Sequence, residues 1–125
     1  MRKRILLVDD IEFNIEFEKY VIDSLQSEVD GLELVVDTAY TVTQAIEKIE
    51  QNEPYDAMII DMNLPDGLGS DIAKAARKKD SNARIAALTI YPKDYEMQRG
   101  LFDLYLSKPI MPQPYKQNLA RLLYI

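Results

Sequence analysis

The sequence predicts an α/β fold in which a parallel sheet of five strands carries helices on both faces. Two observations predict it. Five short apolar runs recur along the chain, and most are nearly continuous, as is typical of strands buried on both faces. Segments with helical spacing of apolar residues separate these runs. The runs are residues 5–8, 32–36, 57–60, 85–88 and 104–106.

The first two helices are predicted from apolar residues that recur every three or four positions. One helix follows the strand at 5–8, and the next follows the strand at 32–36. Taken alone, Asp9 and Glu12 form a capping pattern that could start the first helix, which is the alternative to a functional role for Asp9. The apolar face is predicted at Phe13, Phe17 and Val21 in the first helix and at Val42, Ala45, Ile46 and Ile49 in the second.

The third helix follows the strand at 57–60 and a turn at 64–67, where proline sets φ and glycine supplies flexibility. It carries Ile72, Ala73 and Ala76 on one face, and its basic end at 77–79 suits a helix C-terminus. This segment therefore predicts a turn followed directly by a helix.

The last part of the chain predicts a short fourth helix at roughly 93–100 and a fifth helix after the final strand. Two prolines, Pro112 and Pro114, delay this fifth helix. We expect it to start near Pro114 and to run to Tyr124. Its inward residues are predicted to be Leu119, Leu122 and Leu123.

The composition restricts the function. A chain of 125 residues with 47% hydrophobic content is expected to form a single domain over residues 1–125. Its formal net charge of −6 disfavours direct binding to nucleic acid or to an anionic membrane. The start MRKRILLV has too few consecutive apolar residues for a secretory signal or a membrane span. A cytoplasmic protein is therefore expected.

The chain lacks cysteine and histidine, which excludes disulfides, thiolate metal sites and imidazole ligands. Any metal would therefore be bound by oxygen. Each strand expected to line the crevice at the carboxyl edge of the sheet ends near a polar residue. These residues are Asp9, Asp10, Asp61, Thr89 and Lys108.

Three carboxylates in one crevice repel each other unless a cation neutralises them, and Mg²⁺ suits an oxygen-only ligand set. A carboxylate held against a metal can also attack phosphorus and form an acyl phosphate. Asp61 fits the nucleophile, while Lys108 and Thr89 would bind the new phosphoryl oxygens.

The ordered set VDD, DMNLPDG, ALT and YLSKP resembles the receiver domain of two-component response regulators across nearly the full length. This resemblance implies a flavodoxin-like, doubly wound five-stranded sheet of order 2-1-3-4-5 with about five helices. It also implies that a histidine kinase or phosphotransfer protein phosphorylates Asp61. The chain would then be a signalling switch that catalyses only its own phosphorylation and dephosphorylation.

The resemblance further implies site roles. Asp9, Asp10, Asp61 and the backbone carbonyl of Asn63 would hold Mg²⁺. Lys108 would pair with the phosphoryl group, and Thr89 and Tyr105 would form the switch. Each of these residues also has a structural interpretation when taken alone. Thr89 could simply end a strand, Lys108 could be a solvated charge, and Tyr105 could be a half-buried strand aromatic residue.

Two departures from the receiver pattern bear on output. Ile90 follows Thr89 where the family usually has a small residue, and the span from Thr89 to Lys108 is about three residues shorter than usual. Partner binding and homodimerisation usually involve this part of a receiver, so the output partner is left open.

An interaction module that does not cycle phosphate is the alternative function. A phosphohydrolase is disfavoured because Asn63 replaces its second acid.

Overall fold

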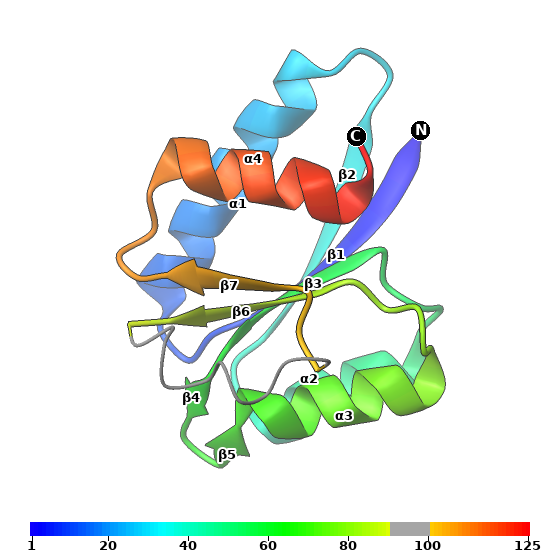
Figure 1. Cartoon of the computed structure of the whole chain (residues 1–125), viewed down its shortest axis with the longest axis vertical. Helices are drawn as coiled ribbons and strands as arrows, with labels where there is room; N and C mark the ends of the chain where they lie inside the picture. The colour runs from blue at the N-terminus through cyan, green and yellow to red at the C-terminus, as the bar shows by residue number, and fades with distance from the viewer. Residues whose placement is uncertain (91–100) are drawn as a thin grey trace.

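The computed structural model describes residues 1–90 and 101–125. Five strands form the main sheet: β1 (Arg2–Val8), β2 (Glu33–Ala39), β3 (Ala57–Asp61), β6 (Ile85–Thr89) and β7 (Leu104–Ser107). The strands are all parallel and lie in the order β2-β1-β3-β6-β7 (Figure 1). This is the predicted order 2-1-3-4-5, counted over the strands of the main sheet.

Four helices cover the sheet in the described part of the chain: α1 (Glu12–Glu28), α2 (Val42–Gln51), α3 (Gly69–Lys79) and α4 (Pro112–Leu123). Helices α1 and α4 lie on one face, and α2 and α3 lie on the other (Figure 1). The fourth helix predicted at roughly 93–100 lies outside the described residues. None of the described helices is long and apolar enough to cross a membrane.

Alternate residues of each central strand enter one of two apolar cores. Ile5, Leu7 and Ile59 face α1 and α4, whereas Leu6 and Ile60 belong to the core that contains α2 and α3. Both cores exclude water from the sheet, which explains the continuous apolar runs in the sequence. The polar residues that end these strands are therefore held on a rigid, fully buried frame.

The start of α1 differs from the prediction in two respects. Ile11, and not Asp9, is the N-cap residue, so the capping pattern of Asp9 with Glu12 was wrong. Phe13 is 75% exposed, whereas Val21 is buried as predicted. Phe13 stacks on Phe17 with ring centroids 6.5 Å apart, but Phe17 is half-buried and packs against the core of α1, α4 and the sheet, as predicted.

The predicted start of the last helix was two residues late. Helix α4 begins at Pro112 because proline lacks only a backbone N–H that the first helical turn does not use. Its three predicted leucines are buried as expected. The predicted turn at 64–67 is confirmed: it joins two short antiparallel strands, β4 (Asn63–Leu64) and β5 (Gly67–Leu68).

Candidate functional site

Three carboxylates meet at the carboxyl edge of the sheet. Asp61 is the last residue of β3, and Asp9 and Asp10 directly follow the neighbouring strand β1. One carboxylate oxygen from each lies within 4.8 Å of the others. Asp9 and Asp61 are buried, and Asp10 is exposed. Chain segments about fifty residues apart thus supply one acidic cluster, because the carboxyl ends of parallel strands share one edge.

Asp9 is fixed by three donors although it is fully buried. Its Oδ1 accepts a hydrogen bond from the backbone N–H of Ile11 at 2.9 Å. Its Oδ2 accepts one from Asn14 Nδ2 at 3.2 Å and lies 3.4 Å from Lys108 Nζ. These contacts hold the carboxylate in one orientation at the entrance to α1.

Lys108 joins the two buried carboxylates. Its Nζ donates to Asp61 Oδ2 at 3.1 Å and lies 3.4 Å from Asp9 Oδ2. Its backbone N–H donates to the carbonyl of Thr89 at 2.9 Å, which continues the pairing of β6 with β7 beyond Ser107. The ammonium group is therefore aimed at Asp61 by the sheet itself.

The local electrostatics follow from burial and from these contacts. Burial raises the pKa of Asp61, although the N–H of Asn63 and the ammonium of Lys108 partly oppose the shift. Burial lowers the pKa of Lys108, but the charges of Asp61 and Asp9 outweigh it, so the pKa is raised overall. Lys108 is therefore a cation at neutral pH, shared by two acids.

The remaining predicted site residues are Thr89, Asn63 and Tyr105, which lie on β6, β4 and β7. Thr89 is buried at the end of β6 and is the register partner of Ser107. Asn63 begins β4, and its backbone N–H donates to Asp61 Oδ1 at 3.1 Å. Tyr105 lies within β7, half-buried, with its ring 5.7 Å from that of Phe102.

Two contributors were missed by sequence reasoning. Asn14 orients Asp9, and its position one turn into a helix that follows two acids is the only signal for it. Gly69 begins α3 so close to β3 that an added Cβ would lie 2.6 Å from the Asp61 carbonyl oxygen. Only glycine permits this approach, and a glycine at the first position of a helix was the available signal.

The residues present fit a hard divalent cation. Among the described residues, three carboxylates face a single ammonium group, which leaves an excess of negative charge, and the candidate ligand atoms are oxygens. Mg²⁺ prefers such oxygen ligands and retains several waters, which the exposure of Asp10 permits. The donor set does not suit metals that require sulfur or imidazole.

Comparison with known proteins decides the family. Residues 5–120 match the response regulator receiver domain. The chain belongs to the receiver domain family. Receiver domains are signalling switches of two-component systems, and the acidic cluster, Thr89 and Lys108 stand at the carboxyl edge of the sheet in this receiver.

Curated relatives are much longer than this chain and are similar to it over a small part of their length. The chain is 26% identical over 119 residues to a putative transcriptional regulator of Haloferax volcanii, covering 95% of the chain and 19% of that protein. It is 32% identical over 112 residues to the aerobic respiration control sensor protein ArcB of Escherichia coli K12, covering 85% of the chain and 13% of ArcB. The chain thus spans at most about a fifth of these relatives.

A solved relative agrees in fold and sequence. The response regulator TrrA of Thermotoga maritima, crystallised in complex with Mg²⁺ and BeF, is 30% identical with a TM-score of 0.75. The match covers 97% of this chain and 99% of TrrA. The fold of this receiver is therefore shared over nearly its whole length with a metal-binding relative.

Proposed function

We propose that this receiver accepts a phosphoryl group on Asp61 in a Mg²⁺-dependent reaction and thereby changes its binding to an output partner. The donor would be a histidine kinase or a phosphotransfer protein in the cytoplasm. The observation that carries the proposal is the contact of Lys108 Nζ with Asp61 Oδ2 at 3.1 Å, inside the cluster formed with Asp9 and Asp10. The Mg²⁺ and BeF bound by TrrA support it.

The proposed reaction is a transfer between two groups. A carboxylate oxygen of Asp61 forms a bond to phosphorus as the bond from phosphorus to the donor nitrogen breaks, and the electron pair leaves with the donor. Lys108, which now binds Asp61 and Asp9, would hold a phosphoryl oxygen. Mg²⁺, held by Asp9, Asp10, Asp61 and the backbone carbonyl of Asn63, would neutralise negative charge on the transferred group.

Switching is proposed to involve the ends of β6 and β7. A phosphoryl group on Asp61 adds charge and acceptor oxygens, which would draw the hydroxyl of Thr89 inward. Tyr105, whose ring packs on Phe102, would then turn toward the space that Thr89 leaves. Leu88 is the register partner of Asp61 and directly precedes Thr89. Asp61 and Thr89 therefore lie at neighbouring strand ends.

Acetyl phosphate with Mg²⁺ tests the phosphoryl transfer directly. Intact-mass analysis of the wild type should show one added phosphoryl group that is lost in base, as expected of an acyl phosphate, and chelation with EDTA should prevent the labelling. Asp61→Asn should not be labelled, because the nucleophilic oxygen is lost. Asp23→Asn removes an exposed acid of α1 and should be labelled like the wild type.

The outcomes separate the two candidate functions. Equal labelling of Asp61→Asn and the wild type would refute Asp61 as the acceptor. A wild type that binds Mg²⁺ but is never labelled would favour the alternative, an interaction module that does not cycle phosphate. Ile90, which is 56% exposed beside Thr89, is the feature that motivates this alternative.

A further inference from the structure

A second carboxyl group is buried in this receiver outside the acidic cluster. Glu18 lies in the middle of α1 and is only 1% exposed. Its Oε1 accepts a hydrogen bond of 2.8 Å from the hydroxyl of Tyr115, a residue of α4 that is itself only 3% exposed. The pair therefore connects α1 with α4. These two helices lie on the same face of the sheet (Figure 1).

Burial and the nearby charges together favour the protonated, neutral form of Glu18. Burial raises the pKa of Glu18 to about 8, and the carboxylates of Asp9 and Asp61 add to the rise, while the hydrogen bond from Tyr115 and the charge of Lys108 oppose it. The other ammonium in this interface, Lys116 Nζ, binds Glu28 Oε1 at 2.6 Å and Ser24 Oγ at 2.9 Å. Glu18 is thus largely protonated at neutral pH.

Tyr115 does not change its charge over the same range. Burial raises the pKa of its phenol well above the ordinary value of 10.0, and the neighbouring Glu18 adds to the rise. The phenol therefore remains a neutral donor throughout. Of these two partners, it is therefore Glu18 that gains or loses a charge near neutral pH.

We propose that Glu18 and Tyr115 form a proton-controlled latch between α1 and α4. With its proton bound, Glu18 is neutral and fits the apolar layer, so α4 packs firmly on α1. When the proton leaves, a carboxylate with one phenol donor stands in a core of aliphatic side chains, close to two other acids. The interface then loosens to admit water.

The latch would act on the part of the chain that carries Lys108. Helix α4 follows Lys108 by four residues, and α1 begins two residues after Asp10. A change in the packing of α1 on α4 therefore reaches both sides of the acidic cluster. This inference does not depend on phosphorylation of Asp61, and it is tested on the unphosphorylated protein without Mg²⁺.

Carbon-detected NMR of the Glu18 side chain from pH 5.5 to 9.5 tests the latch. We expect a titration midpoint near pH 8 for the carboxyl carbon, with amide shifts in α1 and α4 that follow the same curve. Tyr115→Phe should move the midpoint to higher pH, because the phenol donates to the carboxylate and favours its ionised form. If the α4 amide shifts stayed constant while the carboxyl carbon titrated, the hydrogen bond would be purely structural and the latch would be refuted.

A matched comparison measures the loosening itself. At pH 9, amide hydrogen exchange in α4 should be about tenfold faster in the wild type than in Glu18→Gln, which cannot ionise. Glu16→Gln removes an exposed carboxyl group of the same helix and should exchange like the wild type. Asp61→Asn should keep a transition, because the titrating group is Glu18.

Three results would overturn the latch. The first is a Glu18 midpoint below pH 6, and the second is equal α4 exchange in the wild type and Glu18→Gln. The third is a transition that disappears in Asp61→Asn, which would assign it to the acidic cluster. If Glu18→Gln did not fold, the wild-type amide shifts of α4 would decide: shifts that follow the Glu18 titration support the latch, and constant shifts overturn it.

Discussion

The two ends of the sheet use charge in opposite ways. At the carboxyl end, Asp9 and Asp61 share one ammonium, that of Lys108. At the amino ends of β6 and β7, Arg77 donates to the backbone carbonyls of Ala83 and Leu101 and to Asp103 Oδ2 at 3.1 Å. Two acids thus share one cation at the carboxyl end, whereas at the amino end the guanidinium groups of Arg77 and Arg84 share the carboxylate of Asp103.

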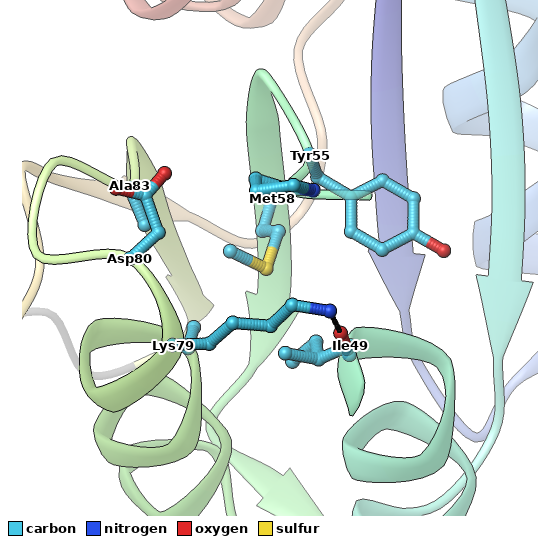
Figure 2. A pocket seen from close by; sticks show the side chains of 8 residues that line it. Ile49, Tyr55, Met58, Lys79, Asp80 and Ala83 are labelled. Carbon is cyan, nitrogen blue, oxygen red and sulfur yellow. Dashed lines mark hydrogen bonds between the residues drawn. The ribbon is translucent and has the colours of Figure 1, made fainter. Parts of the chain in front are cut away.

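Two lysines show the same contrast. Lys79 extends from α3 toward the end of α2, beside a small hollow lined by Tyr55 and Met58 (Figure 2). Its Nζ donates to the carbonyls of Ile49, Glu50 and Asn52, which the end of a helix leaves without partners. Lys108 instead contacts two acids that also suit a metal. The first arrangement serves stability, and the second is the one that we propose for binding a phosphoryl oxygen.

The largest effect on stability is expected at the amino end. Arg77→Met should lower the free energy of unfolding by about 3 kcal/mol, because the carbonyls of Ala83 and Leu101 lose a charged donor and Asp103 loses one of its two guanidinium partners. Urea denaturation measures the loss. Lys78→Met, which changes an exposed neighbour, should alter the value by less than about 0.5 kcal/mol. A similar loss in both variants would contradict the assigned role.

A smaller loss is expected for the helix cap. Lys79→Met keeps the apolar stem but removes the donor to the end of α2, and it should cost about 1 kcal/mol. Hydrogen exchange should localise the effect to the last turn of α2. Labelling by acetyl phosphate should persist in this variant. Its loss would mean that the two ends of the sheet are not independent.

The smallest expected effect is an increase in the free energy of unfolding, in the variant Asp61→Asn. Burial raises the pKa of Asp61, so the folded state binds this proton more tightly than the unfolded state, and stability falls as the pH rises through the folded-state pKa. Asp61→Asn should therefore raise the free energy of unfolding at pH 8 by about 0.5 kcal/mol, and by less at pH 4. A loss of stability at pH 8 would show that the attraction of Lys108 outweighs the burial of the charge.

The sequence by itself determined the sheet and the residues of the acidic cluster. Apolar runs buried on both faces identify parallel strands, and the residue after each run must lie at the same edge of the sheet. This rule placed Asp9, Asp61 and Thr89 at neighbouring strand ends, as the structure has them. The roles of these residues in metal binding and phosphoryl transfer remain predictions, which the labelling experiment tests.

Only the tertiary structure decided which side chains each helix buries and how closely the elements approach. Helical spacing groups Phe13 with Phe17 and Val21, but it does not say which stripe of α1 meets α4. In the fold, Phe13 faces solvent while Glu18 enters the core to meet Tyr115, ninety-seven residues away. Burial and the resulting proton affinity of Glu18 are set by neighbours distant in sequence, so no local pattern reports them.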